Sequence, residues 1–344
     1  MILDSASGLA DKALSTPSAS TTSKRTVRLP IIDAARGVAL AAMVIYHSAW
    51  DITFFNLAPI DAVNSPFWRN FAHGIASSFL FLVGVSLVLA SQNGVNWTTG
   101  YWKAWGKRMA MVVAGAAAVT ASTWFTNPQQ FIFFGILHCI AAASILALPF
   151  LRAPWPLTAL AGAGVIALPF FWTSPLFSHG PLIVTGLADV VPNTADWVPI
   201  FPWFGAVLLG VAAARACLAW FPATAAGRWR DAGRIGKTLT FAGRHSLIIY
   251  LTHQIVLMGL FGAIAWVIGP SQAALDMRVT RTCHFACAAN AGSEAFCQKY
   301  CDCLVGSLRQ DGLSAPVVSG DITPAGRARL GQTIGQCSDA AKPQ

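Results

Sequence analysis

The sequence predicts an all-α fold: a polytopic bundle of about seven transmembrane helices, followed by a small extracytoplasmic tail rich in cysteine. Hydrophobic residues make up 55% of the 344 residues and charged residues 11%, and the mean hydropathy is +0.56. This composition is too apolar for a soluble domain of this length. Apolar runs close to the roughly 20 residues that cross a bilayer recur along the chain. After residue 270 they stop and a cysteine-rich segment begins.

Seven apolar runs are candidate transmembrane helices. They lie at residues 31–50, 71–91, 106–125, 131–151, 156–172, 199–220 and 247–268. Residues 1–27 are rich in Ser, Thr and Ala and lack a continuous apolar stretch, so we expect a disordered cytoplasmic leader there and no cleaved signal peptide. The predicted domains are this leader, a transmembrane domain at 28–270 and the tail at 271–344.

The basic residues predict the orientation, because cytoplasmic loops hold most of the Lys and Arg in membrane proteins. One set of loops contains Lys24, Arg25, Arg28, Lys103, Lys107, Arg108, Arg152, Arg215, Arg228, Arg230, Arg234, Lys237 and Arg244. The opposite loops contain Arg69 against Asp51, Asp61, Asp189 and Asp196. We therefore expect a cytoplasmic amino terminus and a periplasmic tail. The net charge of +9 mainly records this orientation, and the scattered bases argue against a nucleic-acid partner.

The tail predicts a disulfide framework, because six of the eight cysteines lie in a segment placed outside the cytoplasm. They are Cys283, Cys287, Cys297, Cys301, Cys303 and Cys337. Two antiparallel helices that turn near residues 290–292 would pair 283 with 301 and 287 with 297, which leaves 303 for 337. This is one of many connectivities that six cysteines allow. A structural zinc site that includes His284 is the alternative, although its spacing differs from the usual finger pattern.

Ionisable residues inside the predicted spans mark candidate sites, because they are costly in the membrane. In the first span a polar stripe follows one helix face, at spacings of three or four residues. It contains Asp33, Arg36, Leu40, Met43, His47 and Asp51. The step from Arg36 to His47 is about 16 Å along the helix axis.

The predicted topology sorts the polar residues into two layers. The inner layer contains Asp33, Arg36, His253 and Arg244, and the outer layer contains His47, Asp51, His73 and His138. Arginine suits a phosphorylated donor held at the inner side. At the outer side a neutral imidazole can take a proton from an acceptor, and a carboxylate four residues away can orient that imidazole.

Each of these residues also has a structural interpretation. Asp33 and Arg36 could be a simple ion pair, His47 and Asp51 an interfacial hydrogen-bonded pair, and His138 a packing histidine. The chain contains no GxxxxGK[ST], HExxH or GxSxG motif, so the sequence does not support a P-loop NTPase, a zincin metalloprotease or an α/β-hydrolase.

Five segments in order resemble the bacterial branch of the heparan-alpha-glucosaminide N-acetyltransferase catalytic-domain family, over roughly residues 28–268. They are "RLPIIDAARGVALAAMVIYHSAWD", "FLFLVGVSLVLA", "FGILHCIAAASILALPF", "FPWFGAVLLGVAAAR" and "GRHSLIIYLTHQ". The spacing of Arg36 and His47 is also similar to a motif of the acyltransferase-three family, in the same transmembrane acyltransferase group.

The resemblance implies transfer of an acyl group, typically acetyl from acetyl-CoA, across the membrane to a sugar or other acceptor. On matching positions, Arg36 would assist donor binding and His47 would be the catalytic histidine. Lysosomal members are associated with a histidine in the loop before the second span, whereas His73 begins that span in this chain. His47 and His73 therefore both stay candidates, as do direct transfer and an acyl-histidine intermediate.

The sequence therefore predicts an integral-membrane acyltransferase of the bacterial inner membrane. The expected site consists of His47, Asp51 and His73 for catalysis, Asp33, Arg36, His253 and Arg244 for the acyl-CoA donor, and His138 for the acceptor. The expected partners are acyl-CoA, a glycan or glycolipid acceptor and membrane lipid, with neither a metal nor a tightly bound cofactor. The sequence leaves the oligomeric state, acyl length and acceptor open. The alternatives are a small-solute transporter or flippase, or a non-catalytic anchor for the tail.

Overall fold

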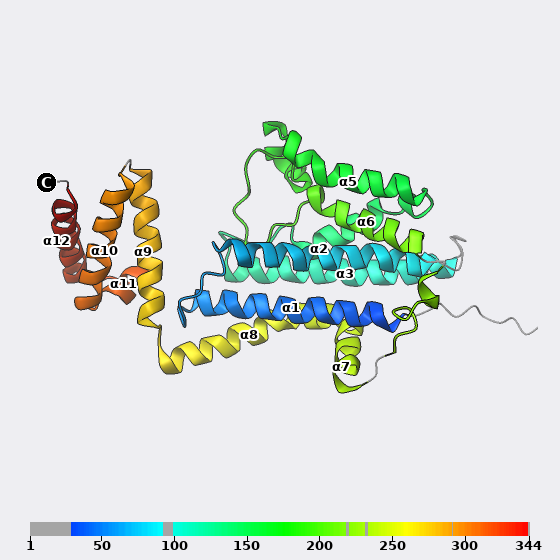
Figure 1. Cartoon of the computed structure of the whole chain (residues 1–344), viewed down its shortest axis with the longest axis horizontal. Coiled ribbons are helices and arrows are strands. Elements are labelled where there is room, and N and C mark those ends of the chain that lie inside the picture. The colour runs from blue at the N-terminus through cyan, green and yellow to red at the C-terminus, as the bar shows by residue number, and fades with distance from the viewer. Residues whose placement is uncertain (1–28, 92–98, 218–219, 231–232, 291, 343–344) are drawn as a thin grey trace, which may run out of the picture.

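The computed structural model describes residues 29–91, 99–217, 220–230, 233–290 and 292–342, and within them all regular structure is helical. The predicted leader at 1–27 lies outside the described residues. The chain forms an elongated helix bundle with a separate group of four helices at one end (Figure 1).

Five of the described helices are long and apolar enough to cross a membrane. They are α1 (Pro30–Phe54), α2 (Pro66–Ser91), α3 (Thr99–Thr126, apolar from Trp102), α6 (Ile200–Cys217) and α8 (Ser246–Ile268). Two shorter apolar helices, α4 (Ile136–Leu146) and α5 (Trp155–Phe171), lie between α3 and α6 in the sequence. These seven helices fall on the seven apolar runs of the sequence.

The run at 131–151 contains less helix than predicted. Residues 131–135 precede α4, and after Leu146 the chain passes into a short 3₁₀ turn, η1 (Pro149–Leu151). Pro149 has no backbone N–H to continue the α-helical pattern, which accounts for the early end. Two further 3₁₀ turns, η2 (Pro175–Ser178) and η3 (Gly180–Thr185), precede α6, and η4 (Phe221–Ala223) follows it.

Small residues allow the central helices to approach closely. Gly84 of α2 faces the backbone of Val207, and Gly210 of α6 faces the backbone of Phe81, so a side chain at either glycine would collide with the opposite helix. This is the usual way in which membrane helices obtain dense packing without a hydrophobic driving force between them. Leu80, Val207 and other buried residues of α2, α4 and α6 form the largest core cluster.

Helix α7 (Gly233–Arg244) was not expected from the sequence, where this segment looked like a basic loop. It stands across the bundle beside the first half of α1 (Figure 1). Gly37 of α1 faces the backbone of Leu239, and Gly243 of α7 faces the backbone of Asp33. Helix α8 therefore begins at Ser246, after α7 has covered the beginning of α1.

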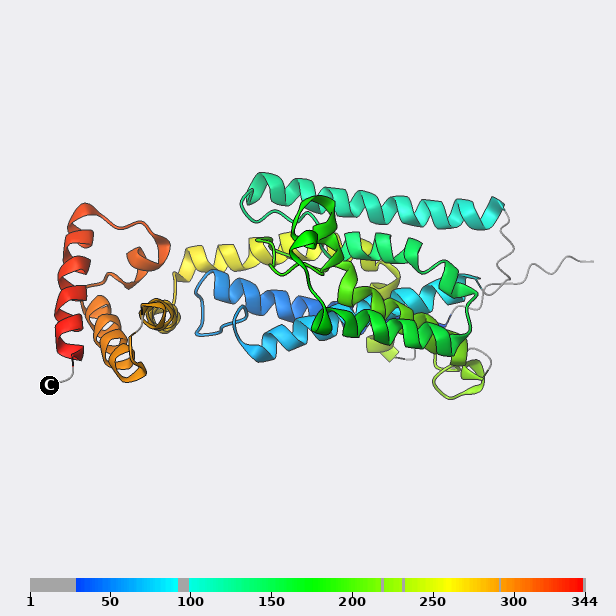
Figure 2. The ribbon, with the colours of Figure 1, turned by 90° about the horizontal axis from the view of Figure 1, so that it is seen from above.

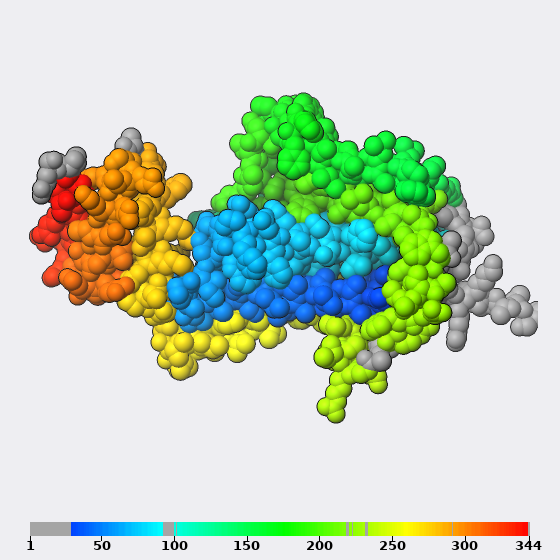
Figure 3. Space-filling model, viewed as in Figure 1, coloured from blue at the N-terminus to red at the C-terminus, as the bar shows by residue number. Residues whose placement is uncertain are grey.

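The tail consists of α9 (Gln272–Ala289), α10 (Glu294–Gln310), α11 (Ser314–Ser319) and α12 (Pro324–Ala341). It lies beyond the ends of α1 and α8, and the space-filling view shows it as a separate lobe (Figures 1–3). Only residues 269–271 separate α8 from α9.

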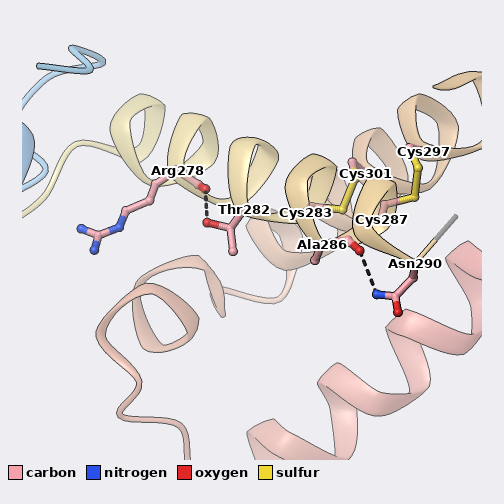
Figure 4. The surroundings of a disulfide bond; sticks show 8 residues. All are labelled: Arg278, Thr282, Cys283, Ala286, Cys287, Asn290, Cys297 and Cys301. Atoms are coloured by element: carbon pink, nitrogen blue, oxygen red, sulfur yellow. Dashed lines mark hydrogen bonds between the residues drawn. A yellow bond between two sulfur atoms is a disulfide. The ribbon is translucent and has the colours of Figure 1, made fainter. Parts of the chain in front are cut away.

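Three disulfides hold the tail together, in the nested pairing that the spacing suggested. Cys283 bonds to Cys301, Cys287 to Cys297 and Cys303 to Cys337, and the first two cross-link α9 to α10 (Figure 4). The zinc alternative is wrong, because these cysteines are all consumed by disulfides and no thiolate of the set is left to bind a metal.

Polar contacts fix the tail on the loop between α1 and α2. The backbone N–H of Ser271 donates to the carbonyl of Asn56 at 2.8 Å, and Arg278 Nη1 lies 3.4 Å from Asn56 Oδ1. Arg281 forms an ion pair with Asp61. The short linker and these contacts keep the beginning of α9 close to the end of α1.

We predict that the Cys303–Cys337 bond stabilises the tail most, because a cross-link that closes a longer loop removes more entropy from the unfolded chain. Its cysteines are 34 residues apart, against 10 for Cys287–Cys297. Replacing Cys303 and Cys337 by Ser should lower the free energy of unfolding by about 3–4 kcal/mol. Replacing Cys287 and Cys297 by Ser should lower it by about 1 kcal/mol less than that. Hydrogen exchange of the tail in the full chain measures both losses of stability. Cys217 forms no disulfide, so Cys217→Ser is the control.

We also predict that acid loosens the attachment of the tail. Burial raises the pKa of Asp61, but hydrogen bonds from the Asn64 backbone and Arg281 outweigh it and leave the pKa below its ordinary value. The Arg281–Asp61 pair therefore stabilises the folded protein fully above the unfolded pKa of about 3.9, and this stabilisation is lost as the pH falls through the lower folded pKa. Because the pair is partly exposed, the loss in the free energy of unfolding is about 1 kcal/mol at most.

Hydrogen exchange of residues 57–63, corrected for intrinsic rates, should show protection that falls below about pH 4 in the native chain. In Asp61→Asn the protection should be low at every pH. Equal protection of the native chain at pH 6 and in acid would contradict the prediction.

Candidate functional site

The first half of α1 meets α2 and α7 at a group of polar and charged side chains, here called the arginine cluster: Asp33, Arg36, Ser86 and Arg244. Arg36 Nη1 donates to Asp33 Oδ1 at 2.6 Å, and its Nη2 donates to Ser86 Oγ of α2 at 2.5 Å. Arg244 of α7 approaches the other Asp33 oxygen at 3.4 Å. Asp33 thus bridges two arginines from different helices, which the expected ion pair between Asp33 and Arg36 did not include.

The two arginines are not equally accessible. The Arg36 side chain is 23% exposed and directs both of its terminal nitrogens to protein partners, whereas that of Arg244 is 47% exposed. Arg244 is therefore the more accessible of the two guanidinium groups. Planar guanidinium groups are suited to phosphate oxygens.

The second half of α1 meets α8 at a second group of polar side chains, here called the histidine cluster: Tyr46, His47, Asp51, His253 and Gln254. The rings of His47 and His253 meet edge to face with their centroids 4.9 Å apart. Gln254 Nε2 donates to Asp51 Oδ1 at 2.8 Å, and Asp51 is fully buried. Tyr46 packs against His47.

His253 was expected in the inner layer with Arg36, and this placement is wrong. The structure puts its ring against His47, at the other cluster. His253 lies in the first half of α8, which would meet the first half of α1 if the two helices began at the same level, but α7 already lies there. The beginning of α8 is consequently displaced along α1, and His253 meets the second half of that helix.

Asp51 does not orient His47 in the way expected. The two residues share a helix face, but the described residues show no hydrogen bond between them, and the Asp51 carboxylate instead reaches across to Gln254 of α8. The histidine whose ring is oriented by a hydrogen bond is His253. Its Nδ1 lies 2.7 Å from the carbonyl oxygen of Tyr250. A carbonyl oxygen only accepts, so Nδ1 carries the proton and Nε2 is left with a free lone pair.

Three buried acceptor atoms of the histidine cluster have no hydrogen-bond partner in the part of the chain that the structure describes. They are Asp51 Oδ2, His253 Nε2 and Gln254 Oε1. Unpaired buried polar atoms are rare and costly in native proteins, so three of them in one cluster indicate that a water or a ligand completes their hydrogen bonds. Because all three accept hydrogen bonds, the cluster is suited to a ligand that brings donors, such as an amine or a hydroxyl group.

The two remaining histidines of the expected site lie elsewhere. His73 of α2 is exposed and packs edge-on against Trp203 of α6, with ring centroids 5.5 Å apart. Both ring nitrogens of His138 are engaged: Nδ1 accepts from the backbone of Gly135 at 3.3 Å, and Nε2 lies 3.2 Å from Thr120 Oγ1. The Thr120 hydroxyl donates to the Ile132 carbonyl. This network gives His138 a structural role between α3 and α4 and gives no support to acceptor binding.

Sequence reasoning missed Asp196, which lies in the loop before α6. Its Oδ2 accepts a hydrogen bond from the first backbone N–H of α4 at 3.1 Å, and it packs so closely on Gly135 that a side chain there would collide with it. Burial raises the pKa of Asp196. Asp196 also interacts electrostatically with Tyr46 of the histidine cluster and with Tyr250, whose carbonyl contacts His253. The only signal in the sequence was an acid directly before the apolar segment "WVPIFPWF".

We predict that the contact between α1 and α7 holds the arginine cluster together. In Gly243→Ala the new methyl group would collide with the backbone of Asp33, so the melting temperature should fall by the equivalent of about 1–3 kcal/mol. Gly259→Ala in α8 is the matched control, since no atom lies near that glycine, and it should melt like the native protein. Equal melting of the two variants would show that the close approach is not required.

Comparison with known proteins supports the resemblance seen in the sequence. The family model described as heparan-alpha-glucosaminide N-acetyltransferase, catalytic, matches residues 28–255, which include both clusters and end before the tail. Neither the curated proteins nor the solved structures contain a match to this chain. The match covers well over half of the chain, and the chain therefore belongs to this family of membrane acetyltransferases.

Proposed function

We propose that the protein transfers an acetyl group from acetyl-CoA to an amine or hydroxyl group of a sugar or glycolipid, with the chemistry at the histidine cluster. The observation that carries the proposal is the set of three unpaired buried acceptors beside His47. An amino sugar or a sugar hydroxyl supplies the donors that these atoms lack. The family relationship supports acetyl transfer and acetyl-CoA as donor in general terms.

His47 is the proposed general base, and transfer is direct. The acceptor nitrogen or oxygen loses its proton to the His47 imidazole as it attacks the thioester carbonyl. The carbon–sulfur bond then breaks, and the imidazolium returns the proton to the leaving thiolate of CoA. His253, with its proton fixed on Nδ1, and the Asp51 carboxylate stabilise the positive charge that appears briefly on His47.

The proposed donor site is the arginine cluster. Arg244 and the neighbouring bases of α7, Arg234 and Lys237, attract the phosphates of CoA, and the Arg244–Asp33 contact links α7 to α1. The distance of about 16 Å between Arg36 and His47 along α1 is on the order of the length of an extended pantetheine arm. One helix thus lines the path from the phosphates to the reacting carbonyl.

The proposed orientation follows the distribution of basic residues. The amino terminus, α7 and the CoA phosphates are on the cytoplasmic side of a bacterial inner membrane, and the acceptor and the tail are on the periplasmic side. The histidine cluster lies towards the end of α1 that is close to the tail, which fits an acceptor that arrives from that side.

Transfer of radiolabelled acetyl from acetyl-CoA to a cell-envelope fraction tests the function directly. Acetyl-CoA should also raise the melting temperature of the purified protein. A transporter, a flippase or an inert anchor predicts neither result, so absence of both would overturn the proposal.

We predict that His47→Ala lowers acetyl transfer by about 10²–10⁴-fold, the usual contribution of a general base. His253→Ala should also reduce turnover. His179→Ala, a change at an exposed loop residue, is the matched control and should keep native activity. Melting curves with acetyl-CoA should show that the His47 variant still binds the donor, because the arginine cluster is unchanged. Full activity of His47→Ala together with loss of activity in His73→Ala would show that His73 is the general base and that His47 is not.

A further inference from the structure

The tail contains a large apolar groove that lies outside the residues matched by the family. Its volume is about 640 Å³, which is within the range of small-molecule sites. The groove is built from one face of each tail helix. On α10 the lining residues recur every four positions as Phe296, Tyr300, Leu304 and Leu308, and on α12 Leu330 and Ile334 follow the same spacing.

The groove enters the core of the tail. Leu304 and Leu308 belong to the buried cluster of the tail and also line the groove, as does Cys283 of the first disulfide. An empty apolar cavity costs stability in proportion to its volume. The three disulfides stabilise the folded tail mainly by restricting the unfolded chain, so they can offset the stability that the open groove costs. The tail is thus built to stay folded around an open apolar space.

The occupant must be apolar over most of its length and charged or polar at one end. Arg278 is the one charged residue of the groove lining, and it also lines a smaller cavity of about 210 Å³ between α9 and the end of α1. Trp50 and Phe54 of α1 border that second cavity. Aromatic side chains at the end of a membrane helix are typical of the lipid headgroup level.

The membrane is therefore the source of the occupant. Residues 269–271 alone separate α8 from α9, and the contacts of Arg278 and Ser271 with Asn56 keep the part of the groove lining at Arg278 close to the end of α1. We propose that the tail binds an anionic phospholipid of the adjacent leaflet, with an acyl chain in the groove and the phosphate at Arg278. This site is independent of acetyl transfer, and the proposal does not rest on the function proposed above.

Photo-crosslinking of the full chain in nanodiscs tests the site. The probe is phosphatidylglycerol with a diazirine on one acyl chain, at low abundance in phosphatidylcholine, followed by peptide mapping. Labelling should appear on peptides that contain the groove faces of α10 and α12. Labelling confined to residues 30–268, which contact the surrounding bilayer, would overturn the proposal.

Two alanines of α9 give a matched pair of variants. Ala286 lines the groove and Ala288 does not, and both are exposed. Ala286→Trp fills the groove and should reduce tail labelling about tenfold, whereas Ala288→Trp should label like the native chain. Mapping of the three disulfides in each variant establishes that the tail has folded. Equal labelling of two correctly folded variants would contradict the proposal.

The headgroup is tested by a second probe, phosphatidylcholine with the same diazirine chain. The native tail should prefer the anionic probe by about fivefold, the effect of one basic residue near an anionic headgroup, and Arg278→Gln should remove the preference. Equal labelling of the native tail by both probes would overturn the assignment of an anionic lipid.

Discussion

The structure depends on one constraint: polar groups on a membrane helix must find partners on neighbouring helices, because the bilayer supplies none. Helix α1 carries such groups at both ends of its polar face. Asp33 and Arg36 are paired by Ser86 of α2 and Arg244 of α7, and Asp51 is paired by Gln254 of α8. The placement of α7 and α8 beside α1 is therefore set by charge and hydrogen bonding as well as by packing.

The same constraint separates structural from reactive groups. The arginine cluster is closed within the protein except at Arg244, so it suits a charged ligand that approaches from outside the bundle. The histidine cluster keeps three acceptors without donors, so it suits a ligand that completes it. The two clusters lie on one helix, which offers a direct route for a long molecule with phosphates at one end and a reacting carbonyl at the other.

Much of the fold follows from local signals. Hydropathy located the apolar helices, and the four-residue spacing of the cysteines on α9 and α10 led to the nested disulfides. The site was less predictable. The position of His253 depends on how far α8 is displaced along α1, which is set by α7. Helix α7 is short and amphipathic, and it lacks the long apolar run that marks the membrane helices in the sequence. The roles of Gln254 and Asp196 depend on helices that are distant in sequence, and no spacing within one helix reveals such partners.

We propose that one acetyl-CoA molecule spans both clusters along α1. A cryo-electron microscopy structure of the full chain with CoA bound is the sharpest test. Density for the phosphates is expected at Arg244 and the α7 bases, and density for the thiol end is expected beside His47 and His253. Phosphates bound away from the arginine cluster, or a thiol end directed to His73, would contradict it.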